Sequence, residues 1–268
     1  MRMNYSKFLY VVAFATVLFT ACGNDSSTSA NNSNDGDNSS KSSSSSAKSS
    51  SSRKKVSSSS NKVTEPVEVT VGSMKDSRDG QKYKTAKIGK QTWMAQNLNY
   101  KTANSYCYDD NASNCSKYGR LYTWAAAMDS AGTFSTNGKG CSCGETCSPT
   151  YPVRGVCPDG WHLPSKDEWN TLFTAVGGSS VAGTKLKSTS GWDSDGNGTD
   201  AFSFSALPAG WRYNYGVYDG EGDDAGFWSS TEGDSENANL MGLDYVDGYA
   251  GLYYGIKNYG FSVRCLKD

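Results

Sequence analysis

One segment of the chain places apolar residues at the spacing of a helix face. Ser165 and Glu168 have the Ser-x-x-Glu spacing of a capping box, in which each side chain bonds the other residue's backbone amide. Gly177 follows, and glycine is the residue that most often ends a helix. The sequence therefore predicts a helix between Ser165 and Gly177 with one buried stripe. The stripe has the spacing i, i+3, i+4 and i+7 and consists of Trp169, Leu172, Phe173 and Val176.

A second helix and several short strands are expected in the rest of the chain. The segment RLYTWAAAMDSAG (120–132) carries a comparable apolar stripe that ends at Gly132. Elsewhere, short runs rich in aromatic and β-branched residues predict strands, the first two joined by a hairpin turn at Gly89-Lys90. Two helices with short antiparallel strands make an α+β domain. The strands are expected in 82–98, 202–210, 227–231, 239–246, 251–257 and 261–266, and the second stripe is Leu121, Trp124, Ala125 and Met128.

The first 21 residues have the layout of a secretory signal peptide. Arg2 and Lys7 precede an apolar run that is too short to span a bilayer. Cys22 follows the small residues Thr20 and Ala21, which resembles the site where a bacterial lipoprotein is cleaved and its cysteine is lipidated. An ordinary cleaved signal peptide, with Cys22 as a spare thiol, is the alternative. We expect an exported lipoprotein of the outer membrane or cell surface, held to the membrane by a lipid on Cys22.

The next segment, 22–62, consists almost entirely of Ser, Asn, Lys and Gly. Such a segment cannot bury enough apolar area to offset the entropy lost on ordering, so we expect a flexible tether. After a linker over 63–74, one globular domain of ordinary size is expected over 75–268. From residue 63 onward, 18 Lys and Arg stand against 24 Asp and Glu, which argues against nucleic acid as a partner.

Eight cysteines in an exported chain predict disulfides. Within CSCGETC (141–147), the first and last cysteines are expected to pair, because a bridge between Cys141 and Cys143 would be strained. Cys143 is then left over. A zinc or copper site built from this trio is the alternative. The expected pairs are Cys107 with Cys115, Cys141 with Cys147, and Cys157 with Cys265.

The single histidine, His162, lies in the segment CPDGWHLPSKDEW (157–169). A catalytic base needs an orienting carboxylate and a nucleophile, and the sequence shows neither next to His162. Asp167 and Glu168 are explained by their place in the first turn of the predicted helix, where acids complement the helix dipole. We therefore expect a structural histidine, no catalytic residues and no enzyme, with a catalytic base as the alternative.

Six blocks of sequence, in the same order, resemble the Fibrobacter succinogenes major paralogous domain over about residues 75–268. The resemblance implies an exported or surface-attached protein, without an established activity, that has a C-type-lectin-like fold. The formylglycine-generating sulfatase-modifying domain shares that fold, and its helix start and closing strand resemble LPSKDEW and GFSVRC. The blocks are DGQKYKTAKIGKQTWMAQNLNY, YGRLYTWAAAM, GVCPDGWHLPSKDEWNTL, FSALPAGWR, FWSST and YGFSVRCLKD.

Two departures limit what the resemblance implies. Formylglycine-generating enzymes hold copper with a cysteine pair near the C-terminus, whereas Cys265 stands alone here, so an oxidase is the least expected function. Sugar-binding C-type lectins bind calcium through a Trp-Asn-Asp motif, whereas Trp228 is followed by Ser229 and Ser230. No cofactor follows from the resemblance.

A stretch rich in acids and tyrosines is the candidate ligand site. Between Arg212 and Lys257 there is no Lys or Arg, and tyrosines alternate with acids. Rigid aromatic faces beside carboxylates suit sugar rings or a basic protein patch. The alternative is a solvated acidic loop whose tyrosines lie in the core. The candidate residues are Trp211, Tyr213, Tyr215, Tyr218, Asp219, Asp223, Asp224 and Trp228.

The segment DSDGNGTD (193–200) begins like a calcium loop. Position 12 of such a loop is Phe204 here, so the bidentate glutamate of an EF-hand is absent. We expect a polar turn, with calcium as the alternative. The oxygen donors for calcium would be Asp193, Asp195, Asn197 and Asp200.

These observations lead to one functional hypothesis and one alternative. The hypothesis is a surface lipoprotein whose single domain serves as a binding or adhesion module for a polysaccharide or a surface protein. The alternative is a structural envelope protein without a specific ligand.

Overall fold

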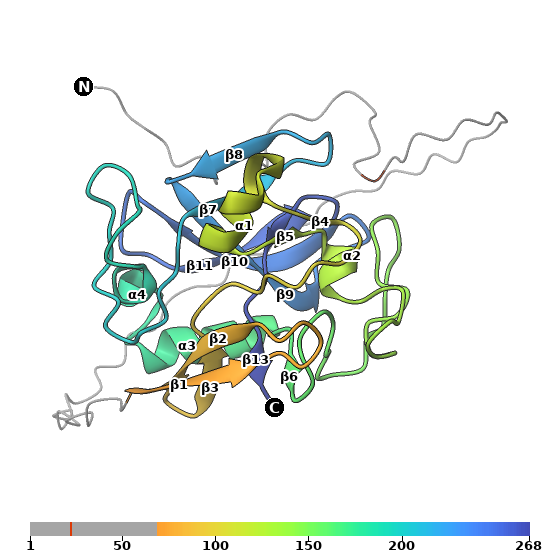
Figure 1. The fold of residues 1–268 in the computed structure, drawn as a ribbon, viewed down its shortest axis with the longest axis horizontal. Coiled ribbons are helices and arrows are strands. Elements are labelled where there is room, and N and C mark those ends of the chain that lie inside the picture. Colours follow the sequence, from red (N-terminus) through yellow and green to blue (C-terminus); the bar gives the residue numbers. More distant parts are fainter. Residues whose placement is uncertain (1–21, 23–68) are drawn as a thin grey trace, which may run out of the picture. The chain divides into compact units, whose positions relative to one another are not determined.

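The computed structural model describes Cys22 and residues 69–268, and the account below concerns these residues. The expected signal peptide (1–21) and, apart from Cys22, the expected tether (22–62) lie outside the described residues. Within the described part, no helix is both long and apolar enough to cross a membrane. Figure 1 shows a small sheet with helix α3 at one end of this part and a strand hairpin, β7–β8, with helix α1 at the other.

The smaller sheet has five strands in the order β1-β2-β3-β13-β6. Its β2–β3 hairpin turns at Gly89 and Lys90, as predicted. The edge strand β1 pairs with β2 along its whole length, so residues 69–74, which were expected to be linker, belong to this sheet. The strands are β1 (Val69–Lys75), β2 (Lys82–Ile88), β3 (Gln91–Met94), β13 (Leu266–Lys267) and β6 (Trp161–His162).

The larger sheet has the order β11-β10-β9-β12-β5-β4, and the β7–β8 hairpin joins it through β9. The strands predicted in 227–231, 239–246 and 251–257 are all present. The segment 202–210 is mostly irregular and enters a strand only at Ala209, so that prediction was largely wrong. The strands are β11 (Gly251–Ile256), β10 (Asn237–Asp244), β9 (Asp224–Glu232), β12 (Phe261–Ser262), β5 (Leu121–Tyr122), β4 (Ser105–Tyr106), β7 (Ala209–Arg212) and β8 (Tyr218–Glu221).

Four α-helices accompany the sheets in the described residues, so the prediction of an α+β domain is confirmed, although two helices were expected. Helix α3 begins with the predicted capping box. Ser165 Oγ accepts from the Glu168 amide, and the Glu168 carboxylate accepts from the Ser165 amide. All four residues of the predicted stripe are buried. The helices are α1 (Ala112–Tyr118), α2 (Trp124–Ala127), α3 (Lys166–Ala175) and α4 (Ser179–Leu186), and a 3-10 turn, η2, spans Tyr108–Asp110.

The second predicted helix was wrong in extent. Leu121 belongs to β5, and α2 is a single turn. Asp129 ends it with a φ of 56°, in the left-handed region. Its carboxylate then accepts from the amides of Thr133, Phe134 and Ser135 at 2.6 to 3.0 Å. These bonds turn the chain where the apolar spacing alone predicted another helical turn.

The C-terminal segment, 261–268, is divided between the two sheets. Residues 261–266 were predicted as one strand, but β12 pairs with β9 and β5 in the larger sheet, whereas β13 pairs with β3 and β6 in the smaller one. Between them, Arg264 is fully buried. Its guanidinium donates to Asn97 Oδ1 at 2.8 Å and to the backbone carbonyls of Phe204 and Ser205.

Two buried clusters form the core of the described part. In one, Trp93 of β3 stacks on Trp169 of α3 with ring centroids 4.5 Å apart, and Phe227 of β9 packs against Trp169. The other contains Trp124 and Trp228, whose indole N–H groups donate to backbone carbonyls at 2.8 and 2.7 Å. The larger sheet contributes to both clusters, so its burial on two sides explains its long apolar runs.

The three predicted disulfides are present, and the cysteines of CSCGETC are all bonded. Cys143, expected to be left over, pairs with Cys22, so that prediction was wrong. In this structure the three cysteines are disulfide-bonded, so none of them is present as the thiolate that a zinc or copper site would need. The predicted bridges are Cys107–Cys115, Cys141–Cys147 and Cys157–Cys265.

We predict that two of these bridges differ in their effect on stability. Cys157–Cys265 closes a separation of 108 residues and Cys107–Cys115 one of 8. The loop-closure entropy removed from the unfolded chain corresponds to about 4–5 kcal/mol for the first and about 2.5 kcal/mol for the second. Denaturant unfolding of the two double alanine variants should show this order. Equal losses, or a larger loss for the short loop, would contradict it.

Candidate functional site

The β7–β8 hairpin carries most of the aromatic residues that the sequence marked as a candidate ligand site. Trp211 pairs with Asp219, and Arg212 pairs with Tyr218. The turn is closed by a hydrogen bond from the Tyr213 amide to the Val217 carbonyl at 2.8 Å. Because neighbouring residues of a strand project to opposite faces, the hairpin presents two separate sets of side chains.

One face of the hairpin is a ladder of aromatic rings. Tyr213 and Tyr215 are nearly parallel, with centroids 5.2 Å apart and an angle of 9° between the rings. Trp211 and Tyr259 meet Tyr213 edge-on, at 6.0 and 5.1 Å. Tyr215 is the outermost ring and is 69% exposed. Hence Tyr213 supports one side of Tyr215, and the other side is open to solvent.

The opposite face fixes the hairpin to the domain. The Arg212 guanidinium lies 3.8 Å from the centre of the Tyr106 ring. Tyr218 packs against Tyr108, and its hydroxyl donates to Asp110 Oδ1 at 2.6 Å. Burial and this hydrogen bond raise the pKa of Tyr218 to about 12, so the hydroxyl keeps its proton at neutral pH. The hairpin therefore holds Tyr215 on a fixed support.

Not every candidate residue joins this face. Asp219 supports it, because its carboxylate accepts from the Gly220 amide at 2.9 Å and lies 3.4 Å from the Tyr213 hydroxyl. Asp223 is half-buried at the far end of the hairpin. Trp228 and Asp224 are 0% and 2% exposed, so the structure places them in the interior and not on this face. In β9, Asp224 precedes an apolar residue and Trp228 follows one. These apolar neighbours were a sequence signal for burial that the prediction overlooked.

The structure does not bring the calcium candidates of 193–200 together. Asn197 Oδ1 accepts from the Trp192 amide, and both carboxylate oxygens of Asp200 accept from Ser205. Among the described residues, no group of three or more His, Cys, Asp or Glu side chains is placed to hold a metal, so Asp193, Asp195 and Asp200 do not converge.

His162 is held between two carboxylates, so the orienting carboxylate that the sequence did not show is present in the structure. Its Nδ1 lies 2.7 Å from Asp268 Oδ1, and its Nε2 lies 2.9 Å from Glu168 Oε1. The Ser165 hydroxyl donates to Glu168. His162 therefore links β6 to the start of α3 and to the end of the chain, and each of its ring nitrogens bonds a carboxylate.

The two carboxylates decide the charge of this histidine. Burial lowers the pKa of His162, but the hydrogen bonds to Glu168 and Asp268 outweigh it and raise the pKa above 6.5. Burial likewise raises the pKa of Glu168, but bonds from His162 and Ser165 bring it below 4.5. The contribution of His162 to stability is thus complete below pH 6.5 and lost as the pH rises through its folded pKa, whereas that of Glu168 is lost at acid pH.

Sequence reasoning missed a buried lysine that organises the cysteine-rich loop. Lys257 is fully buried, and its Nζ donates to Glu232 Oε1 at 2.5 Å and to the backbone carbonyl of Glu145 at 2.9 Å. The Glu232 carboxylate in turn accepts from the Cys147 amide. The only sequence signal for this residue was its position. Lys257 is the first cation after 44 acidic or neutral residues, so acidic partners for its ammonium group lie nearby in the sequence.

Comparison with known proteins identifies the family of this chain. The model of the Fibrobacter succinogenes major domain matches residues 86–267, so the chain belongs to this family. No curated protein and no solved structure matched it. The family description gives no ligand, and the site above rests on its own geometry.

The single histidine permits a direct test of the carboxylate clamp. We expect NMR titration of the His162 imidazole to give a pKa above 6.5, and a lower value in Asp268→Asn, because one stabilising carboxylate is lost. Asp159→Asn is the matched control, since Asp159 is exposed and bonds Arg154 rather than His162. A pKa below 6.5 in the unaltered protein, or an equal shift in both variants, would contradict the clamp.

Proposed function

We propose that this protein is an exported, surface-attached binding module that holds a polysaccharide against the Tyr215 ring. The observation that carries the proposal is the parallel Tyr213–Tyr215 stack with its outer ring 69% exposed. Sugar C–H groups pack on the electron-rich face of an aromatic ring, and the phenol hydroxyl adds a hydrogen bond. A preformed platform also spares the entropy of ordering tyrosines on binding.

A C-type-lectin-like fold is part of the proposal. It is supported by the two motifs that resemble the fold, the helix start LPSKDEW and the closing strand GFSVRC. The segments that carry them are neighbours in space, because Leu266 of β13 pairs with His162 of β6, just ahead of the helix start. The structural-envelope alternative has no comparable observation in its favour, since such a role does not need an exposed aromatic stack.

Replacing Tyr215 with alanine tests the platform. On an array of plant polysaccharides, the unaltered full chain should bind at least one, and Tyr215→Ala should bind it about tenfold or more weakly, because the exposed ring face is lost. Tyr254→Ala is the matched control, since Tyr254 is 64% exposed on β11, away from the ladder.

Three results would count against the platform. Equal binding by Tyr215→Ala with an intact fold would contradict the role of the ring. Binding to no polysaccharide at all would favour a structural role. Capture of a surface protein through the same tyrosine would replace the polysaccharide with a protein ligand.

Attachment through a lipid on Cys22 is the second part of the proposal. A lipid and the Cys22–Cys143 disulfide require the same sulfur, so a lipidated molecule must carry Cys143 as a free thiol. Labelling with an alkynyl fatty acid is expected to succeed in the unaltered chain and to fail in Cys22→Ser. The labelled form should react with maleimide at Cys143. Unlabelled protein in which Cys22 and Cys143 remain bonded would rule out the lipid anchor.

A further inference from the structure

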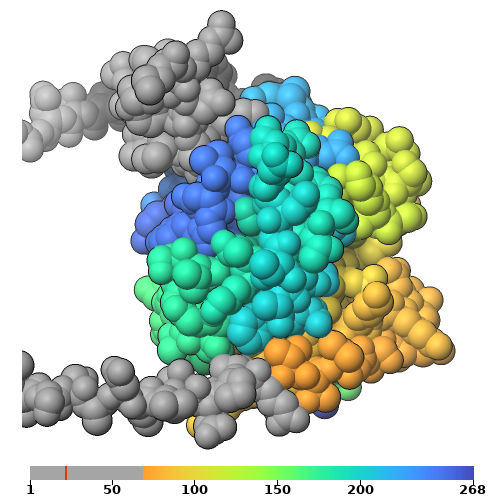
Figure 2. Space-filling view, turned by 90° about the vertical axis from the view of Figure 1, so that its left-hand side faces the viewer, coloured from red at the N-terminus to blue at the C-terminus, as the bar shows by residue number. Residues whose placement is uncertain are grey.

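A cavity lies between β2, the loop after β3 and helix α1, apart from the aromatic hairpin. Its volume is about 200 Å³. Its polar and charged lining residues include Gln81, Lys84, Gln96, Asn99, Ser116 and Lys117. In Figure 2, α1 in yellow-green and the β2 region in orange lie on the same side of the molecule.

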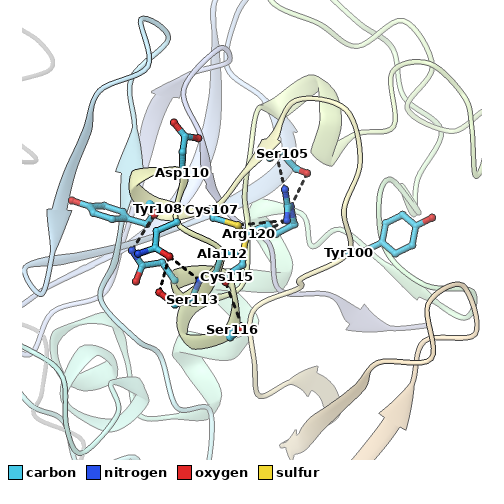
Figure 3. Close-up of a disulfide and its surroundings, with 12 residues drawn as sticks. Tyr100, Ser105, Cys107, Tyr108, Asp110, Ala112, Ser113, Cys115, Ser116 and Arg120 are labelled. Atoms are coloured by element: carbon cyan, nitrogen blue, oxygen red, sulfur yellow. Dashed lines mark hydrogen bonds between the residues drawn. A yellow bond between two sulfur atoms is a disulfide. The ribbon is translucent and has the colours of Figure 1, made fainter.

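The wall formed by α1 is fixed by a disulfide. Cys107–Cys115 ties the middle of the helix to the strand before it, and the Arg120 guanidinium lies 3.3 Å from Cys115 Sγ (Figure 3). Arg120 also donates to the side chain and backbone of Ser105. On the opposite side, Asn97 is held by Arg264 and by the Tyr118 carbonyl. The cavity is therefore a permanent feature of the domain.

The cavity is lined by amide groups with unused hydrogen-bonding capacity. Asn99 Oδ1 is buried and has no donor among the described residues, which is a costly state for an acceptor. Gln96 uses its Oε1 for the Lys84 amide, and its NH₂ group has no acceptor in the described residues. Amides that donate and accept suit a ligand with several hydroxyl groups.

The charge of the lining is opposite to that of the domain. Lys84 and Lys117 line the cavity, and no Asp or Glu does, although acids outnumber cations in this domain. Lys117 also reaches Glu221 at 3.5 Å, at an exposed site where the pair is weak. Lys84 forms no ion pair among the described residues. Its ammonium group is therefore available to a carboxylate.

We propose that this cavity binds a single sugar residue that carries a carboxylate, a hexuronate. Sites for drug-sized ligands measure roughly 300–1,000 Å³, so a cavity of about 200 Å³ admits a ligand of monosaccharide size. The amides bind the hydroxyl groups, Asn99 gains its missing donor, and Lys84 binds the carboxylate. The site is separate from the Tyr215 platform, so an experiment can disprove one of the two proposals and leave the other standing.

Calorimetric titration of the full chain tests the site with three probes. Glucuronate should bind more tightly than methyl glucoside, which lacks the carboxylate, and more tightly than acetate, which lacks the hydroxyl groups. Asn99→Leu should weaken glucuronate binding tenfold or more, while the melting temperature stays the same or rises because an unpaired buried acceptor is removed. Lys84→Gln should weaken glucuronate binding and leave methyl glucoside unaffected.

Controls separate this site from general effects. Lys87→Gln makes the same charge change on β2 outside the cavity and should leave all three affinities unchanged. Tyr215→Ala should also leave glucuronate binding unchanged. Absence of glucuronate binding at millimolar concentration overturns the proposal. So does equal binding of glucuronate and either control probe, or full binding by Asn99→Leu.

Discussion

The C-terminal segment constrains the whole domain, because its eight residues are hydrogen-bonded into both sheets. Phe261 and Ser262 join the larger sheet, and Leu266 joins the smaller one between β3 and β6. Between these points, Val263 and Cys265 accept backbone bonds from Leu98 and Met94. The two sheets therefore cannot separate unless this segment leaves at least one of them.

Covalent and ionic contacts hold the segment in place. The disulfide from Cys265 reaches Cys157, just ahead of β6, and the His162 clamp reaches Asp268. Arg264 is a buried charge, but its guanidinium has backbone and side-chain acceptors and lies over the Phe204 ring at 4.3 Å. Burying an arginine without such partners would be strongly unfavourable. The motifs that resemble the family thus contribute to the framework of the domain.

The parts of the fold that were predicted correctly are those that depend on local interactions. Helix α3 was found because its capping box and apolar stripe lie within fourteen residues, and the β2–β3 hairpin because its turn follows directly on a strand. The final strand was not resolved into two, because the alternation of apolar residues stays the same when a chain passes from one sheet to another. Helix α2 was predicted to be too long because Leu121, which belongs to the buried strand β5, lies at the spacing of the helix stripe.

The candidate site was predicted only in part, because only some of its residues are close together in the sequence. Tyr213, Tyr215 and Tyr218 are close in sequence, so their concentration was visible, but their division between two faces depends on the hairpin register. Tyr259 reaches the ladder from another part of the chain, and no local pattern points to it. The cavity beside α1 combines residues from four separate segments and has no sequence signature at all.

We propose that recognition takes place on the exposed hairpin and that the framework around His162 is structural. This can be tested by recording amide chemical shifts of the isotope-labelled full chain while soluble xylan is added. We expect the perturbed amides to cluster at residues 213–217 and at Tyr259. Perturbations centred on His162, Tyr151 and Ser230, which line a separate cleft beside α3, would contradict it.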